Sequence, residues 1–301
     1  MELRVDHRIG RSVTVSAGET GLATYVYRPD TVTLESPKPY LHPLRTLAGD
    51  EVSLFRPHDH VWHKGIAWSL PHVGEHNFWG GPTYVHGSSY VQRPDNGSAS
   101  HRTIDGLEVT ASTASLSHRL DWTSQGGAAV LSERRSLGFA LVDDVSWVLT
   151  FETAMTNVSG ETLAFGSPTT KGRENAGYGG LFWRGPRSFT GGVLQSPGGI
   201  GGDELRGTRA EWFAFRGRHD GVDRSSTVLI ADHTANPRHP PQWFARTEEF
   251  ACLNPAPFFS EELDLPDGRT VTFRYAVVIA SGDHGDAGTA ALAAHAWAAP
   301  A

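Results

Sequence analysis

Three stretches near the middle of the chain decide its fold class: LEVTASTASLSHRLDW at residues 107–122, AVLSERRSLGFAL at 129–141 and VSWVLTFETAMT at 145–156. In each stretch apolar and polar residues alternate over many positions, as they do in strands that bury one face. We therefore predict three long antiparallel strands. Residues 226–231 and 269–280 are apolar segments bounded by turn residues, which predicts two further strands of a buried sheet.

The flanking sequence extends this β pattern toward both ends of the chain. Alternation at residues 3–5, 13–15 and 23–27 predicts an N-terminal meander. Only residues 286–299 are typical of a helix, with Asp286 as its cap, Leu292 and Trp297 facing the sheet and Pro300 after its end. The 34 Gly and 18 Pro fit many short strands joined by tight turns. The expectation is an all-β, antiparallel two-sheet fold with one short C-terminal helix, formed by residues 1–301 as a single domain.

Composition excludes several classes of partner. The 26 Lys and Arg against 33 Asp and Glu give a formal net charge of −7, which argues against nucleic acid or an anionic membrane surface as a partner. The single cysteine, Cys252, cannot form an internal disulfide and lies in an apolar segment, so we expect it to be buried. No apolar segment is long enough to span a bilayer, and the N-terminus lacks the apolar core of a secretory signal. The expected location is cytoplasmic.

Long segments without a strand or helix pattern separate the predicted strands, and such loops are usually functional in a compact fold. They span residues 56–87, 167–180, 196–207 and 233–241. They carry 8 of the 15 His and 3 of the 9 Trp. Because Trp faces suit the apolar faces of sugar rings, this composition indicates a small-molecule carbohydrate ligand.

The densest polar cluster is RPHDHVWHKG at residues 56–65. On an extended strand His58 and His60 face the same side and Asp59 the other, while His63 follows a turn. His58, Asp59 and His60 are candidate ligands of a divalent metal ion. The alternative is that these histidines are polar cleft residues that bind sugar hydroxyls without a metal.

A second polar loop, ADHTANPRHPP at residues 231–241, follows an apolar strand. It presents acids, bases and a guanidinium within eight residues, which favours a binding or catalytic loop. The residues concerned are Asp232, His233, Asn236, Arg238 and His239. The alternative is an Asx-type turn in which Arg238 has a structural partner.

Two glycine-containing segments complete the candidates. KGRENAGYGGLFWR at residues 171–184 places Lys171 and Glu174 beside backbone that a ligand can approach closely. Its glycine spacing does not match a dinucleotide fingerprint, so no nucleotide is expected. In NFWGG at residues 77–81, Trp79 is a candidate stacking platform, the alternative being that Phe78 and Trp79 belong to the core.

With these motifs in view, the chain resembles a soluble family of unknown function labelled "methane oxygenase PmoA". Segments in the same order over nearly the whole chain carry the resemblance: residues 39–43, 59–65, 77–79, 178–185, 232–240 and 250–281. The chain differs at Val61 and Trp62, where family members often carry Pro and His. The resemblance implies a carbohydrate context, with a sugar oxidoreductase as a partner. True methane oxygenase chemistry is not expected, since the membrane enzyme needs spans that this sequence lacks.

The order of the loops is also similar to the aldose 1-epimerase, or galactose mutarotase-like, supersandwich. That family carries a catalytic Glu in its late segment, and the aligned residue here is Asn254. An amide cannot accept a proton at neutral pH, so mutarotase chemistry through this position is not expected.

These observations lead to one functional hypothesis and its alternatives. We expect a carbohydrate-active enzyme of sugar catabolism that uses acid–base chemistry, namely epimerisation, β-elimination or hydrolysis, on a sugar, keto-sugar or glycoside. The expected catalytic residues are His63, His233 and Glu174, and the expected substrate-binding residues are Lys171, Arg238, Trp79, Asn236, His239 and Asn254. The alternative is a non-catalytic sugar-binding or accessory protein that partners a sugar oxidoreductase. Metal-dependent oxygenase chemistry is a third hypothesis.

Overall fold

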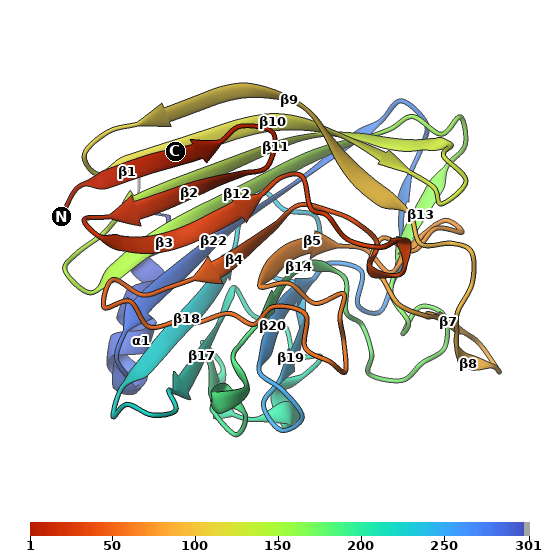
Figure 1. The fold of residues 1–301 in the computed structure, drawn as a ribbon. Helices are drawn as coiled ribbons and strands as arrows, with labels where there is room; N and C mark the ends of the chain where they lie inside the picture. Colours follow the sequence, from red (N-terminus) through yellow and green to blue (C-terminus); the bar gives the residue numbers. More distant parts are fainter. Residues whose placement is uncertain (298–301) are drawn as a thin grey trace.

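Two large sheets dominate the computed structural model, which describes residues 1–297, and every pairing between its strands is antiparallel (Figure 1). The eight-stranded sheet contains, in spatial order, β1 (Leu3–Arg8), β2 (Ser12–Ala17), β3 (Thr20–Val26), β4 (Tyr40–Leu44), β5 (Ile66–Ser69), β14 (Gly180–Arg184), β20 (Cys252–Ala256) and β19 (Gln242–Arg246). The nine-stranded sheet contains β16 (Gly199–Gly201), β15 (Val193–Ser196), β17 (Trp212–Arg218), β18 (Ser225–Asp232), β22 (Thr270–Ser281), β12 (Ser146–Asn157), β11 (Ala129–Leu141), β10 (Thr113–Thr123) and β9 (Ser98–Val109).

Smaller elements lie around these sheets. A three-stranded sheet contains β21 (Leu263–Leu265), β13 (Leu163–Gly166) and β6 (His72–Val73), and a hairpin contains β7 (Thr83–Val85) and β8 (Ser89–Val91). Three 3-10 turns are η1 (Thr33–Glu35), η2 (Arg187–Phe189) and η3 (Asp203–Leu205), and the one α-helix in residues 1–297 is α1 (Gly285–His295). The prediction of an all-β, antiparallel fold of two main sheets with a C-terminal helix is confirmed.

The main core fills the space between the two large sheets. Trp68 of β5 packs its ring 5.2 Å from Phe273 of β22 and donates its indole N–H to Met155 Sδ of β12 at 3.3 Å. In β22 the odd-numbered side chains from Phe273 to Ile279 face this core, and the even-numbered Ala276 to Ala280 pack with α1 on the other face. Burial on both faces explains why β22 is continuously apolar from Tyr275 to Ala280.

The stretch at residues 107–122 is a correction to the sequence analysis, since it forms the end of β9, a turn and β10. Thr110 closes the turn, because its N–H donates to Thr113 O at 2.7 Å and its Oγ1 accepts from Thr113 N at 3.0 Å. Val109 continued the apparent alternation, yet this residue is 50% exposed. One apolar residue on the solvent side thus made two strands look like one.

The helix also differs in detail from its prediction. It begins one residue earlier, at Gly285, so Asp286 lies in the first turn and is not the N-cap residue. The Asp286 carboxylate accepts a hydrogen bond from Arg216 Nη2 at 3.0 Å. Leu292 is buried against the nine-stranded sheet as expected, whereas Trp297 is 41% exposed. The predicted residues 298–300 lie outside the described residues.

The predicted loop at residues 56–87 contains β5, β6 and β7, which is a further correction. These strands are two to four residues long and mostly buried, so they show no alternation that a sequence pattern could reveal. The loops at 167–180 and 233–241 lie almost entirely between strands, as expected. Across residues 1–297, no helix has the length and apolar character needed to cross a bilayer.

Candidate functional site

The floor of the site is the outer face of three neighbouring strands, β14, β20 and β19. Cys252 of β20 is in register with Arg184 of β14 on one side and with Arg246 of β19 on the other. Since alternate residues of a strand share a face, Phe182 lies on the same face as Arg184, and Phe244 on the same face as Arg246. The intervening residues point into the main core, including Trp183, Leu253 and Ala245.

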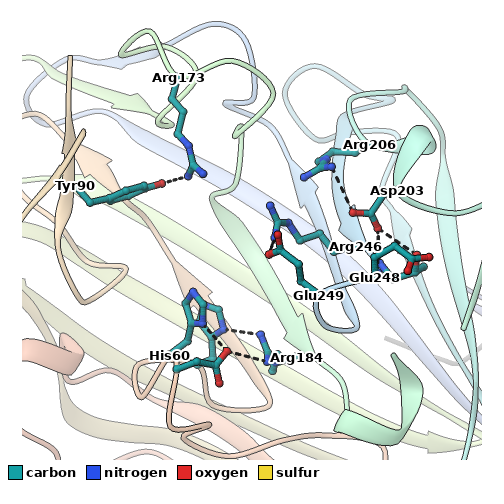
Figure 2. Close-up of polar contacts among 12 residues, drawn as sticks. His60, Tyr90, Arg173, Arg184, Asp203, Arg206, Arg246, Glu248 and Glu249 are labelled. Carbon is teal, nitrogen blue, oxygen red and sulfur yellow. Dashed lines mark hydrogen bonds and ion pairs between the residues drawn. The ribbon is translucent and has the colours of Figure 1, made fainter. Parts of the chain in front are cut away.

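A cavity of about 380 Å³ opens over this face. Six aromatic side chains from four different segments line it: Trp62, Trp79, Tyr178, Phe182, Phe244 and Phe250. Its polar lining comes from His60, His63, Tyr90, Arg173, Arg246 and Glu249. In the view of Figure 2, His60 and Arg184 lie on one side, Tyr90 and Arg173 on the opposite side, and Arg246 with Glu249 between them. We call this space the aromatic cavity.

A carboxylate–imidazole pair lies at one edge of the aromatic cavity. Asp59 Oδ2 is 2.9 Å from Nδ1 of His60, and Arg187 Nη2 donates to Asp59 Oδ1 at 2.7 Å. Partial burial opposes ionisation of Asp59, but the hydrogen bonds from His60 and Arg187 and the charge of Arg184 hold its pKa well below its ordinary value. An ionised carboxylate can only accept, so Nδ1 of His60 carries a proton, and the acceptor nitrogen of the neutral imidazole is Nε2.

His63 stacks on His60, with ring centroids 4.8 Å apart, and its proton lies on the other ring nitrogen, Nε2, for the following reasons. Burial, with the nearby charge of Arg184, lowers the pKa of His63 well below its ordinary value, so the ring is neutral. Arg184 Nη1 lies 3.3 Å from His63 Nδ1, and a guanidinium only donates, so the His63 proton is on Nε2. The site therefore combines a basic imidazole nitrogen with a neutral imidazole N–H donor.

Arg184 is fully buried under this pair. Its guanidinium carbon is 3.7 Å from the centroid of the Phe250 ring, and its Nη2 is 3.7 Å from Asp59 Oδ2. Burial lowers its pKa to about 10. Among residues 1–297, Nε and Nη2 of Arg184 have no hydrogen-bond partner. A buried, incompletely paired guanidinium is costly to fold, which is typical of a functional position.

The opposite edge carries a phenol pair and a guanidinium. The Tyr90 hydroxyl lies 2.8 Å from that of Tyr178 and accepts a hydrogen bond from Arg173 Nη1. The guanidinium of Arg173 also lies over the Tyr90 ring, 4.8 Å from its centroid. Burial raises the pKa of Tyr178 well above its ordinary value, so this phenol stays protonated.

The position of Trp62 in the wall of the aromatic cavity depends on two glycines. Gly80 and Gly81 have φ angles of +103° and +68°, and a Cβ on either would come within 2.7 Å of the Trp62 side chain. Glycine at both positions lets Trp62 lie directly on the backbone. Lys38 supports the same segment from below, because its Nζ donates to the carbonyl oxygens of Trp79 at 2.9 Å and Ser36 at 3.0 Å.

A buried carboxylate holds the histidine loop in place. Glu35 accepts from Arg56 Nη2 at 2.7 Å and lies 2.8 Å from Lys64 Nζ, so it pairs with both ends of the segment that carries His60 and His63. Burial opposes ionisation of Glu35, but these hydrogen bonds lower its pKa overall. The two ends of the loop are thereby fixed to one point.

The structure brings only some of the predicted site residues to this cavity. His60, His63 and Trp79 line it. Phe78 belongs to the main core, so the core alternative applies to Phe78, whereas Trp79 lies at the cavity. Glu174 is exposed and is not among the lining residues. Lys171 lies elsewhere, in a smaller cavity of about 210 Å³ with His72, and its Nζ is 2.6 Å from Glu262.

The loop at residues 232–240 does not line the aromatic cavity, and its side chains pair with structural partners. Asn236 bonds both to Asp232 and to the backbone of Arg274, and His239 Nδ1 is 2.7 Å from Asp232 Oδ2. Arg238 donates to the carbonyl oxygens of Pro257, Glu261 and Glu262. Arg238 thus has structural partners, as the alternative prediction for this loop states. His233 packs its ring 4.8 Å from Trp297, away from the site.

Asn254 lies on the floor of the site, opposite Phe244, but its amide is committed to the backbone. Its Oδ1 accepts from Gly179 N at 2.8 Å and its Nδ2 donates to Leu181 O at 2.8 Å. It therefore holds the turn before β14. Cys252 is buried as predicted, which raises the pKa of its thiol to about 12.

The predicted metal ligands do not form a cation site. Asp59 is occupied by Arg187 and His60, and His58 Nδ1 lies 3.1 Å from Arg187 Nη2. Two guanidinium groups beside the only carboxylate of the set repel a cation. Over residues 1–297, no group of three or more His, Cys, Asp or Glu side chains is arranged to hold a metal ion. These residues do not fit a metal.

Sequence reasoning missed Tyr90, Arg246 and Phe250. One signal for Arg246 was present: the segments Phe182–Arg184 and Phe244–Arg246 both read Phe-x-Arg at the end of an apolar strand. Finding their common face requires the pairing of both strands with β20, which the sequence does not reveal. Tyr90 carried no comparable signal, since it lies on a three-residue strand.

Comparisons with known proteins place the chain in a family but assign no activity. No curated protein is similar enough in sequence to match it. Among solved structures, galactose 1-epimerase from Lactobacillus acidophilus NCFM has 10% identity and a TM-score of 0.41 over 93% of this chain and 100% of its own. Heparan sulfate lyase HepC from Pedobacter heparinus has 9% identity and a TM-score of 0.38 over 90% of this chain.

The chain spans only 33% of the length of that lyase, and at these identities and TM-scores neither likeness carries a conclusion about chemistry. The methane oxygenase label of the sequence resemblance stays a prediction. The family model that does match covers residues 12–294 and is described as a family of unknown function. Since the match covers nearly the whole sequence, the chain belongs to this family, DUF6807.

Proposed function

We propose that the protein is a carbohydrate-active enzyme that holds a sugar in the aromatic cavity and moves protons with His60 and His63. The observation that carries the proposal is the opposed pair of stacked imidazoles at the edge of an aromatic-lined space. His60 offers a lone pair on Nε2, supported by Asp59 at 2.9 Å, and His63 offers an Nε2–H, supported by Arg184 at 3.3 Å. Acid–base catalysis needs one group of each kind.

The lining favours a sugar over other small molecules. Six aromatic side chains offer flat apolar surfaces for the C–H faces of a sugar ring. The imidazoles, phenols and guanidiniums around them offer hydrogen bonds to hydroxyl groups. A volume of about 380 Å³ is within the range of small-molecule sites, roughly 300–1,000 Å³.

The chemistry that this arrangement supports is proton transfer at a carbon or hydroxyl oxygen. Nε2 of His60 is the proposed base, held in one tautomer by Asp59. Nε2–H of His63 is the proposed donor to a developing negative charge on oxygen, and its depressed pKa keeps it neutral. Tyr90, which accepts from Arg173, is a second candidate for proton transfer on the opposite edge. Epimerisation and β-elimination both need such a base and donor.

The test is a ligand and turnover screen with matched histidine variants. Calorimetric titration with galactose, glucose, galacturonate, glucuronate and their methyl glycosides measures binding, and proton NMR of the same mixtures detects product. His60→Gln and His63→Gln are expected to lose at least about 100-fold in turnover. His233→Gln is the control, because His233 lies outside the cavity, and it should keep wild-type turnover.

Each outcome decides between the candidate functions. Product that forms in proportion to protein and disappears in His60→Gln supports the enzyme. Sugar binding without any product over long incubation overturns the enzyme and supports the sugar-binding alternative. No binding of any sugar in the panel contradicts the carbohydrate assignment itself.

A further inference from the structure

The aromatic cavity carries an excess of positive charge that a neutral sugar does not need. Arg173 and Arg246 line it, and Arg184 lies buried beneath its Phe250 wall. Glu249 is the one carboxylate among the lining residues. This local excess stands against a formal net charge of −7 for the whole chain.

Arg173 is the guanidinium that lacks a counter-charge. Its polar partner is the Tyr90 hydroxyl, and within residues 1–297 no carboxylate forms an ion pair with it. Its side chain is half-buried, so water satisfies its remaining donors only in part. A guanidinium presents five donors in a planar fork that matches a carboxylate, and Arg173 has most of these donors free.

Arg246 shows what kind of group fits at the cavity floor. Its Nη1 donates to Glu249 Oε2, while its guanidinium lies 5.4 Å from the centroid of Phe250 and its Nε has no partner among residues 1–297. The Glu249 side chain is 68% exposed, and it reaches back from the β19–β20 turn to this arginine. An exposed carboxylate therefore occupies the position that a ligand carboxylate can take.

We propose that the ligand of the aromatic cavity is an acidic sugar whose carboxylate is bound by Arg173 and Arg246, and that Glu249 occupies Arg246 until the ligand displaces it. This inference rests on the proposed function, since it names the substrate class of the same site. The aromatic walls then hold the ring, and the guanidiniums hold the acid group. Displacement exchanges one carboxylate for another on Arg246, so the ligand does not face an uncompensated desolvation of that arginine.

The proposal predicts changes of opposite sign for two neighbouring residues. Glu249→Gln removes the competing carboxylate, so galacturonate and glucuronate should bind about 3- to 10-fold more tightly, a larger gain than for galactose. Arg246→Met and Arg173→Met should each weaken uronate binding at least about 10-fold. Glu248→Gln is the matched control: Glu248 is exposed on the same turn but does not line the cavity, so uronate affinity should not change.

The experiment is calorimetric titration of the full chain and these four variants with galacturonate, galacturonate methyl ester, galactose and galactose 6-phosphate. Tighter uronate binding by Glu249→Gln, together with weaker binding of the methyl ester by the wild type, supports the proposal. Equal affinity for galacturonate and galactose overturns it while leaving the carbohydrate assignment intact. Binding of the phosphate but not of the uronate overturns the carboxylate assignment, and no binding of any of the four ligands overturns both proposals. Melting curves of the arginine variants identify any that fail to fold, in which case the Glu249→Gln comparison decides.

Discussion

Asp59 Oδ2 and Nδ1 of His60 are 2.9 Å apart, and this contact between consecutive residues sets which nitrogen of the imidazole is basic. The sequence alone placed the two side chains on opposite sides of an extended strand. In the structure, Asp59 and His60 lie in a series of tight turns, in which His60 N donates to Pro57 O and His63 N to His60 O. The turns bring the carboxylate back onto its neighbour's ring.

Asp59 is therefore a positioning residue for His60. In Asp59→Asn the amide no longer fixes the His60 proton on Nδ1, so turnover should fall by about 100-fold or more while sugar affinity changes little. Nitrogen NMR of the imidazoles checks the cause, because the variant should lose the single Nδ1–H tautomer of His60. Unchanged turnover with an unchanged tautomer contradicts this role.

Trp62 should contribute to sugar binding without supporting the fold. It is partly exposed at the cavity rim, so Trp62→Ala should weaken binding by about 2- to 10-fold through lost ring contacts. Calorimetric titration measures the change. Trp297→Ala is the control, since Trp297 is also partly exposed but lies against His233, and an equal loss in both variants is the result that argues against Trp62 as a platform.

We predict that Arg184 contributes to turnover but does not stabilise the folded protein. Two nitrogens of its buried guanidinium have no hydrogen-bond partner among residues 1–297, so Arg184→Met should leave the free energy of unfolding within about 1 kcal/mol of the wild type, or increase it. Turnover should fall, because His63 Nδ1 loses its donor. Urea denaturation and activity assays measure the two effects, and a loss of stability above about 3 kcal/mol shows that Arg184 is mainly structural.

Glu35 should be among the most sensitive carboxylates of the chain. Glu35→Gln leaves Arg56 and the buried Lys64 without their shared counter-charge, which is expected to cost about 3–5 kcal/mol of unfolding free energy. Glu51→Gln removes the partner of Arg45 at an exposed position and should change stability by no more than about 0.5 kcal/mol. Similar urea midpoints for both variants contradict the anchoring of the histidine loop by Glu35.

Burial of Asp232 predicts a pH dependence of stability. Burial raises its pKa from 3.8 to about 6, against hydrogen bonds from Asn236 and His239. Between these values the folded chain binds more protons than the unfolded chain, so stability from this group rises as pH falls from about 6 to 3.8. Relative to Asp232→Asn, the wild type should gain up to about 3 kcal/mol between pH 7 and pH 4. Parallel stability curves for the two proteins contradict this prediction.

The sequence predicted those parts of the molecule that depend on local pattern. The strand at residues 129–141 coincides with β11, because its alternation matches a sheet with one buried face. The sequence predicts that segments 56–65, 171–178 and 232–240 form one site. The first two contribute to the aromatic cavity, and residues 232–240 do not. The polar and aromatic residues of these segments do not follow the alternating pattern of a half-buried strand, and this difference marks them as candidate site residues.

The remaining features depend on partners that are distant in sequence. The loop at residues 232–240 has the same polar composition as the histidine loop, but Asp232, Asn236 and His239 satisfy one another, and a sequence does not show which polar groups are already paired. Arg246 reaches the site only through the register of β19 with β20. Such long-range pairings are set by packing rather than by local pattern.

Hydrogen–deuterium exchange with and without galacturonate tests the location of the site most directly. Saturating ligand should slow exchange in residues 56–65, 171–178 and 244–250, which surround the aromatic cavity, and leave residues 232–240 unchanged. Protection confined to residues 232–240, or to the smaller cavity around His72 and Lys171, contradicts the account.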